Sequence, residues 1–463
     1  MGIKPTSMSV SPQSSVARKI LRLGTPLLFV QLTHYLHQIA DSAMLGHYGS
    51  GSLELAAIGI AGLVTWILMT FLWPLSAGVQ ALASRRYGRQ QADSTSDKAV
   101  TGEVLDNGLV VGVLAALLAL GVSLLVRPVL GVLLQSEGIL DLVMDYVDII
   151  RFSLVPMGFF IIGQGFMGAI NRTRPVMYAG VLSNLLNIAL NWLLIFGNLG
   201  LPAMGIQGAA LGTALATGVA ALYLIAVLVL QGYRRDYRLF TFRALSARLQ
   251  KDMVRVALPP GIQNILALMI FLVFQTLVEG YGAIYLAATH SIFAYMRLNK
   301  TIIGGFARAA SILVGNALGR GDKVEAQEAM TTLGVVGGGI AVTVAIGTVF
   351  ARGYIAALFT NDPATQTVLA TGLLFFTGFY FMEALGYAFE MVFVSNGYGR
   401  YVLFSELSTN VVFILGATLL VRYFFPEQVV LAWFSFGLYQ VCHAAFMIGG
   451  FMRGRWLNVE VES

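Results

Sequence analysis

The sequence predicts an all-α integral membrane protein with twelve transmembrane helices, arranged as two parallel six-helix repeats. Three observations predict this fold. Only 11% of the 463 residues are charged, 57% are hydrophobic and the mean hydropathy is +0.77, whereas about a quarter of the residues are charged in soluble proteins. Apolar segments long enough to cross a bilayer recur along the chain. The two halves of the chain also share short motifs at constant spacing.

The apolar segments are the predicted membrane helices, because a helix satisfies its own backbone hydrogen bonds in lipid and needs roughly 20 mostly apolar residues to cross. They fall at about 20–46, 54–84, 106–132, 143–169, 176–197, 207–231, 257–280, 285–317, 330–358, 367–394, 402–423 and 427–451. The predicted organisation is an N-terminal tail over 1–17, a first lobe over 18–231, a basic linker over 232–256, a second lobe over 257–451 and a C-terminal tail over 452–463.

The basic residues predict the orientation of these helices. With both termini on the cytoplasmic side, the outer loops hold only Arg127, Arg352 and Arg422, and the basic linker lies inside. This asymmetry follows the positive-inside rule, so both termini are predicted to be cytoplasmic. The same distribution accounts for the net charge of +6 without a nucleic-acid partner.

An internal repeat relates the two halves. Pro26 and Tyr48 match Pro259 and Tyr281 at an offset of 233 residues. The offset then becomes 231, which pairs Gly88-Arg89 with Gly319-Arg320, and later 225, which pairs Asn171 with Asn396. Two halves with six helices each and the same orientation are parallel repeats, and a cavity between two such lobes is what alternating access requires.

Several function classes are excluded by what the sequence lacks. The lone Cys442 excludes a disulfide framework and a multi-cysteine metal site. His290 and His443 are isolated, so packing is the expected role of each, and no group of His, Cys and carboxylates has metal-ligand spacing. No Gly-rich loop follows a strand, which argues against an ATP motor. We therefore expect neither an enzyme nor a cofactor.

Asp41 is the first candidate for function, because a carboxylate inside a membrane helix is costly and survives mostly where it lines a cavity or a proton path. Helical spacing places it on one face of the first helix with other polar residues, which we expect to line a substrate cavity: Gln31, His34, His37 and Gln38. The alternative is a structural ion pair between Asp41 and Arg151, at comparable depth in the fourth helix.

Pro26 is a candidate hinge. It lies fifteen residues before Asp41, and a proline removes one hydrogen bond of the helix and kinks it. Protonation of Asp41 could therefore be relayed as bending at Pro26. The alternative is a kink with no switching role, since helical prolines are tolerated in membranes.

The second lobe has a different polar pattern. The repeat partner of Asp41 is Phe274, so a carboxylate function there has to come from Glu383 or Glu390, which share a face of the tenth helix. The alternative is a structural network in which three cations of the eighth helix neutralise three anions: Arg297, Lys300 and Arg308 with Glu383, Glu390 and Glu406.

The repeat motifs resemble those of the multidrug and toxic compound extrusion (MATE) family. The resemblance spans the whole chain and rests on the following segments: Pro26 through Asp41 to Met44-Leu45-Gly46-His47-Tyr48-Gly49, the segment from Ala309 to Asp322, and Asn187-Ile188-Ala189-Leu190-Asn191-Trp192-Leu193 with Gly205-Ile206-Gln207-Gly208. It implies a V-shaped, two-lobed antiporter of the prokaryotic NorM-like and DinF-like branches, and hence a multi-pass protein of the bacterial inner membrane.

The resemblance also implies roles for individual residues. It makes Asp41 the coupling carboxylate and surrounds it with polar residues of the fifth and sixth helices, which here are Asn187, Asn191 and Thr213. It also suggests Glu383 as a cavity residue, because Glu383-Ala384-Leu385 resembles the family's acidic motif. One departure concerns Asn191, where the family often has Asp, so one fewer anionic ligand is available for Na⁺.

The expected function is therefore export of lipophilic or cationic small molecules in exchange for H⁺, with Na⁺ as the second choice of coupling ion, by a monomer surrounded by membrane lipids. The alternative within transport is a flippase for lipid-linked glycans, which would need a strongly cationic central cavity, and the predicted cavity has few basic residues. An integral-membrane enzyme would need paired acids or a metal set near one membrane face, and neither is found in the sequence.

Overall fold

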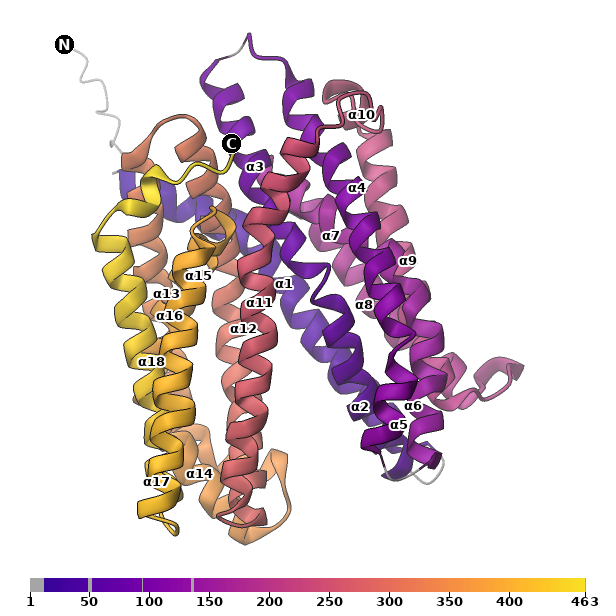
Figure 1. Cartoon of the computed structure of the whole chain (residues 1–463), viewed down its shortest axis with the longest axis vertical. Helices are drawn as coiled ribbons and strands as arrows, with labels where there is room; N and C mark the ends of the chain where they lie inside the picture. Colours follow the sequence, from indigo (N-terminus) through magenta and orange to yellow (C-terminus); the bar gives the residue numbers. More distant parts are fainter. Residues whose placement is uncertain (1–11, 49–51, 94, 135–136, 463) are drawn as a thin grey trace, which may run out of the picture.

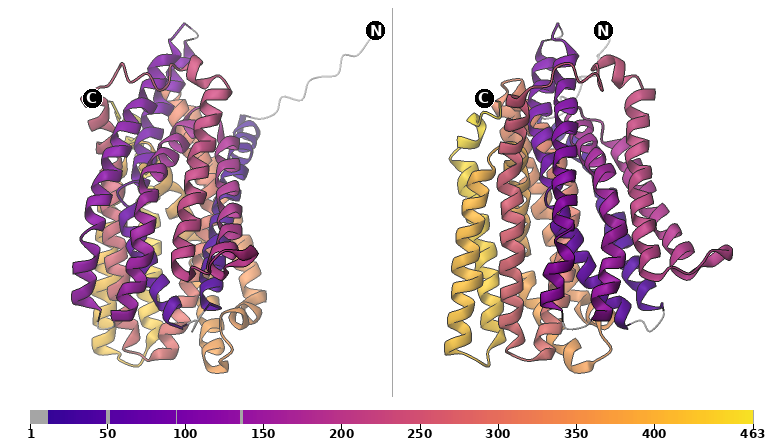
Figure 2. Two further views of the ribbon diagram at one scale, coloured as in Figure 1. Left: turned by 90° about the vertical axis from the view of Figure 1, so that its right-hand side faces the viewer. Right: turned by 45° about the vertical axis from the view of Figure 1, so that its right-hand side comes forward.

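The computed structural model describes residues 12–48, 52–93, 95–134 and 137–462, and its secondary structure over that part of the chain is helical. Two bundles of helices lie against each other at the end that carries the C-terminus and diverge toward the opposite end (Figure 1). We call these the termini end and the far end. The further views show the same arrangement (Figure 2). The architecture has the predicted V shape with two lobes.

The first lobe contains the helices before the linker. They are α1 (Pro12–Gly46), α2 (Ser52–Met69), α3 (Trp73–Ala92), α4 (Lys98–Ser123), α5 (Val126–Leu133), α6 (Glu137–Ile150), the short 3-10 helix η1 (Arg151–Ser153), α7 (Leu154–Ala169), α8 (Thr173–Phe196), the 3-10 helix η2 (Asn198–Gly200) and α9 (Gly205–Leu230).

The linker and the second lobe follow. They contain α10 (Tyr233–Asp236), α11 (Ala247–Glu279), α12 (Ala283–Gly319), α13 (Lys323–Phe359), α14 (Pro363–Thr377), α15 (Tyr380–Ser395), α16 (Gly399–Thr409), the π-helix η3 (Asn410–Ala417), α17 (Thr418–Phe424), α18 (Val429–Met452) and the 3-10 helix η4 (Arg455–Asn458).

Eleven of the twelve predicted spans are long and apolar enough to cross a membrane. Ten are single helical segments of the described chain, and the eleventh is the pair α14 and α15, which is bent by 61°. The twelfth is α1, whose polar residues set it apart from the others. Several predicted spans are also broken into two helices, because Pro74, Pro128 and Pro156 lie in the first turns of α3, α5 and α7, where the missing N–H is tolerated.

The first helix of each lobe begins in contact with the other lobe. Ile20 of α1 packs in a core cluster with Ile303 and Val314 of α12, whereas Met253 of α11 packs in a cluster with Leu82 of α3. Figure 1 shows α1 running obliquely from the second lobe at the termini end toward the far end of the first lobe. The termini end is therefore closed by apolar contacts that involve equivalent helices of both repeats.

The basic linker is attached to α4. Asp106 is buried and accepts hydrogen bonds from the backbone N–H groups of Phe240, Thr241 and Phe242 at 2.7 to 3.0 Å. The linker is shorter than predicted, because α11 begins at Ala247. A buried carboxylate of the first lobe thus fixes the chain that leads into the second.

Candidate functional site

Asp41 lies near the end of α1 and faces α8. Asn191 Nδ2 donates to Asp41 Oδ1 at 2.6 Å, and His37 Nε2 lies 3.2 Å from Asp41 Oδ2. The Asp41 side chain is 16% exposed. One carboxylate oxygen therefore accepts a hydrogen bond from an amide, and the other lies beside an ionisable imidazole.

A chain of hydrogen bonds extends from Asp41 into the first lobe. Asn191 Nδ2 also reaches Asn187 Oδ1 at 3.3 Å, Asn187 Nδ2 donates to Thr213 Oγ1 at 2.9 Å, and Thr213 Oγ1 donates to the carbonyl of Ala209. Asn187 and Asn191 are buried and lie one helical turn apart on α8, whereas Thr213 is on α9. The structure thus brings together the four residues proposed for ion coupling.

Tyr146 belongs to this site and was missed in the sequence. It is buried on α6 and lies near Thr213 and Asp41. Its helix also carries Asp141 and Asp148, whose side chains are largely exposed. The acidic residues of this helix suggest a solvent-exposed segment, so the sequence does not reveal that the opposite face of the helix is buried in the lobe.

The alternative ion pair between Asp41 and Arg151 is wrong. Arg151 Nη1 instead lies 2.9 Å from Asp148 Oδ1, one turn earlier in the same helical segment. Within the described part of the chain, Asp41 forms an ion pair only with His37. Asp148 pairs with Arg151 in place of Asp41 because it lies only three residues earlier in the chain, so the two side chains meet without any contact between separate helices.

The predicted polar stripe of α1 divides between two directions. His37 faces Asp41, and the His34 and His37 rings contact edge to face at 5.2 Å between centroids. Gln31 instead faces the second lobe, because a side chain added at Gly304 would come within 3.7 Å of Gln31 Nε2. The side chain of Gln38 lies outside the described residues. Pro26 is buried within the continuous helix α1.

Glu383 of the second lobe is held by α12. Asn299 Nδ2 donates to Glu383 Oε2 at 3.2 Å, and Lys300 Nζ lies 3.6 Å from Glu383 Oε1. The Glu383 side chain is only 4% exposed. This geometry matches the predicted pair with Lys300 and favours a structural network around Glu383, and a role in the substrate cavity stays a prediction.

The rest of the predicted cation network is wrong. Arg308 Nη2 donates to Ser76 Oγ of the first lobe at 3.0 Å, and Arg297 is exposed and forms no ion pair with a carboxylate among the described residues. Glu390 and Glu406 are bound by His443 instead. A histidine distant in sequence thus replaces the two arginines.

His443 of α18 is not an isolated packing residue. Its Nδ1 lies 3.0 Å from Glu406 Oε2 and its Nε2 lies 3.4 Å from Glu390 Oε2. Tyr439 donates to Glu406 Oε1 at 2.7 Å, and Gln263 Nε2 donates to Glu390 Oε1. Neither ring nitrogen forms a hydrogen bond with these carboxylates among the described residues, so the cluster consists of close contacts between an ionisable ring and two carboxylates.

This cluster also corrects the expectation that no group of His and carboxylates comes together. The ligand atoms of Glu390, Glu406 and His443 lie within 4.8 Å of one another. The residues come from three helices, so their spacing in the sequence gave no signal.

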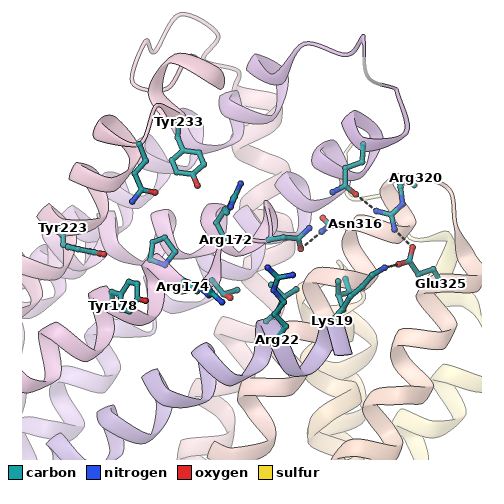
Figure 3. A pocket seen from close by; sticks show the side chains of 17 residues that line it. Lys19, Arg22, Arg172, Arg174, Tyr178, Tyr223, Tyr233, Asn316, Arg320 and Glu325 are labelled. Carbon is teal, nitrogen blue, oxygen red and sulfur yellow. Dashed lines mark hydrogen bonds and ion pairs between the residues drawn. The ribbon is translucent and has the colours of Figure 1, made fainter. Parts of the chain in front are cut away.

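A basic cavity of about 640 Å³ lies at the termini end, between α1, α8 and α9 on one side and α12 and α13 on the other (Figure 3). Five basic side chains and one carboxylate line it: Lys19, Arg22, Arg172, Arg174, Arg320 and Glu325. The sequence placed most of these residues in inner loops and gave no sign that they share one cavity.

The match to a known protein family falls in the same two halves of the chain. The MatE family model matches residues 26–193 and 259–419. A probable multidrug resistance protein NorM of Pseudomonas aeruginosa is 31% identical over 69% of this chain and 64% of its own length. A probable NorM of Agrobacterium fabrum is 28% identical over 65% of this chain and 63% of its own length. The matched segments thus span slightly less than two thirds of these relatives.

The fold is also found among solved structures. The outward-facing conformation of a multidrug resistance MATE family transporter of the MOP superfamily superposes with a TM-score of 0.84 over 96% of this chain and 97% of that one, at 21% identity. The sequence motifs, the family match in both halves and the shared fold agree, and the chain belongs to the MatE family.

Proposed function

We propose that the protein is a multidrug efflux antiporter of the bacterial inner membrane, which exports lipophilic or cationic small molecules in exchange for H⁺. The observation that carries the proposal is the environment of Asp41. This carboxylate sits inside a membrane helix and is bound by Asn191 and His37 rather than by an arginine or lysine. A carboxylate that is not neutralised permanently is free to take up a proton or a cationic substrate.

The two states of Asp41 require different hydrogen bonds. In the ionised state both oxygens can only accept; one does so from Asn191 and the other faces His37 at 3.2 Å. In the protonated state the carboxyl group becomes a donor and needs an acceptor. Asn191 Oδ1 is buried and has no hydrogen-bond partner among the described residues, so rotation of this amide would supply the acceptor. Protonation would therefore rearrange the contact between α1 and α8.

The position of Asp41 suits a proton that enters from the far end. The termini end is closed by contacts between the lobes, including Gln80 with Ser311 and Arg308 with Ser76. With both termini in the cytoplasm, this arrangement corresponds to an outward-facing state. Protonation of Asp41 would release the substrate outward, and the return to the inward-facing state would release the proton to the cytoplasm.

A proton is favoured over Na⁺ by the chemistry of the site. Hard cations prefer several oxygen ligands, and carboxylates bind them best. The described site offers one carboxylate, and the amide nitrogen of Asn191 points at it. Na⁺ would need both amides to rotate so that their oxygens face the ion, whereas H⁺ needs only one.

The test is efflux of ethidium from proteoliposomes under an imposed pH gradient or an imposed Na⁺ gradient. We expect the pH gradient to drive export by the wild type, and Asp41→Asn to lower the rate at least about ten-fold. Asp141→Asn is the matched control, because Asp141 is an acid of the same lobe whose side chain is 66% exposed. Equal export by Asp41→Asn and the wild type would remove Asp41 from the mechanism, and export driven by Na⁺ alone would overturn the proton assignment.

The hinge at Pro26 belongs to the same proposal. A proline leaves the carbonyl four residues earlier without its helical partner, which here is the carbonyl of Arg22 beside the basic cavity. Bending of α1 there would move its cytoplasmic part against α12. Unchanged transport by Pro26→Ala would dispose of the hinge. We further propose that one chain carries the whole cycle, which reconstitution at a single copy per liposome tests.

A further inference from the structure

The basic cavity has an uneven distribution of charge. Glu325 is its single carboxylate, and it is already bound to Lys19 at 2.9 Å and to Arg320. Arg320 also donates to Gln91 at 2.6 Å. The only acid of the cavity therefore neutralises Lys19 of α1 and Arg320, which directly follows α12.

Three arginines on the other side have no such partner. Arg22 of α1 and Arg172 and Arg174 at the start of α8 form no ion pair with a carboxylate in the part of the chain that the structure describes. Figure 3 shows them together on one side of the cavity, with Lys19, Glu325 and Arg320 on the other. Three like charges in one cavity repel one another. No carboxylate on this side of the cavity offsets that repulsion.

Neutral donors surround the three arginines. Helix α8 begins at Thr173 in the wall of the cavity, and no side chain caps it. Its first N–H groups and the positive end of its dipole therefore add to the field of the arginines. The amides of Asn171 and Asn316 contact each other at 2.9 Å. They complete the wall of the cavity between the two lobes.

The chemistry of these groups selects the ligand. A guanidinium matches the oxygens of a phosphate in a two-point contact, and several arginines together favour a phosphate over a carboxylate. We propose that this cavity binds a phosphate-bearing anion through Arg22, Arg172 and Arg174. Because Asn316 of α12 and Arg320, which directly follows that helix, line the same cavity, the bound anion holds the two lobes together at the termini end.

A phosphate could come from a lipid headgroup or from solution. Tyr178, Tyr223 and Tyr233 line the cavity on the side of α8 and α9, and Tyr178 is 53% exposed. Tyrosines are enriched at the level of lipid headgroups, and basic cavities between membrane helices on the cytoplasmic side bind anionic headgroups. This placement favours the lipid, and the two sources are separated by experiment.

The test uses the full chain in detergent and measures binding, so its outcome does not depend on the proposed transport function. One arm titrates inorganic phosphate by calorimetry. The other measures retention of cardiolipin, with phosphatidylcholine as the neutral comparison, by native mass spectrometry. Binding of cardiolipin alone identifies a headgroup as the source, and binding of inorganic phosphate identifies a soluble ion. Both results support the proposal, and binding in neither arm overturns it.

Two double variants decide where the anion binds. Arg172→Gln with Arg174→Gln should weaken binding at least about ten-fold. Arg234→Gln with Arg235→Gln removes the same charge from the exposed helix α10, outside the cavity, and should leave binding unchanged. Equal loss in both pairs would mean diffuse attraction and would overturn the proposal. Arg22→Gln, on a different helix, repeats the test if the first pair fails to fold, and unchanged binding by that variant would also count against the site.

Discussion

Gln80 and Ser311 occupy equivalent positions in the two repeats and form a hydrogen bond with each other. Gln80 Nε2 donates to Ser311 Oγ at 2.7 Å, and both side chains are buried. Their separation of 231 residues equals the offset that relates Gly88 to Gly319 in the sequence. The axis between the repeats therefore passes between α3 and α12 at the termini end, where the lobes are in closest contact.

Gly88 should be intolerant of a side chain. A Cβ atom there would lie 2.9 Å from Gly319 Cα and still closer to the carbonyl of Asn316, and neither backbone can move without separating α3 from α12. We expect Gly88→Ala to weaken closure of the termini end. Cysteines introduced at Gln91 and Arg320, in a Cys442→Ser background, should be cross-linked by a short bis-maleimide several-fold more slowly in this variant.

Gly59→Ala is the matched control for Gly88. It adds the same methyl group to α2, where no atom lies within 4 Å of the new Cβ. Its cross-linking rate should equal that of the parent. An unchanged rate in Gly88→Ala would show that this contact does not hold the lobes together.

Asn191→Asp should change the coupling ion. Asn191 Nδ2 lies 2.6 Å from Asp41 Oδ1, so the substitution places two carboxylates at hydrogen-bond distance, and they must share a cation. We expect a Na⁺ gradient alone to drive ethidium export about ten-fold faster in this variant than in the wild type, because a second carboxylate supplies the ligands that a hard cation prefers.

The control for Asn191 lies two turns earlier on the same helix. Asn184 is also buried, but it donates to Thr33 Oγ1 at 2.7 Å rather than to Asp41. Asn184→Asp should therefore show no response to Na⁺. The same response in both variants, or in neither, would contradict the role given to Asn191.

The sequence predicts most of what depends on position along one helix. The offset of 231 residues makes Gln80 and Ser311 equivalent positions without predicting that they meet, and the resemblance to the family anticipates the contact of Asp41 with Asn191. Tyr146 and His443 were missed because their partners come from other helices, and a single tyrosine or histidine among apolar residues carries no sign of its partner. The ion pair of Asp41 with Arg151 failed because depth along the membrane normal does not fix which way two side chains face.

His443 should be essential to the stability of the second lobe. Its ring separates Glu390 from Glu406, so His443→Ala leaves buried Glu406 and partly buried Glu390 without their shared partner. Removing one partner from a buried ionic cluster costs roughly 3–5 kcal/mol. We expect a marked loss of thermal stability in detergent, measured by the melting of the helical circular dichroism signal.

Two comparisons separate the ionic cluster from packing. His290→Ala changes an exposed histidine of the same lobe and should have little effect. Combining His443→Leu with Glu390→Gln and Glu406→Gln removes every charge of the cluster and should recover most of the lost stability. If the triple variant is no more stable than His443→Ala, the cluster does not act through its charges.

The C-terminal tail should detach from the first lobe in acid. Glu462 lies 2.5 Å from Arg86 Nε and 2.6 Å from Arg89 Nη2, and Val461 is buried in the core cluster that contains Leu82 of α3. Partial burial opposes ionisation of Glu462, but hydrogen bonds from Arg89 and Arg86 prevail and hold its pKa below the ordinary value of 4.5. A carboxylate with a depressed pKa in the folded state stabilises that state above its ordinary pKa and loses this contribution as the pH falls through the depressed value. We therefore expect hydrogen exchange in residues 456–462, corrected for its intrinsic pH dependence, to be slow at pH 6 and faster below about pH 4.

Glu462→Gln should exchange rapidly at both pH values, whereas Glu460→Gln, which changes an exposed neighbour, should behave like the wild type. A tail that stays protected in Glu462→Gln would mean that Val461 and its apolar contacts hold it without the ion pairs.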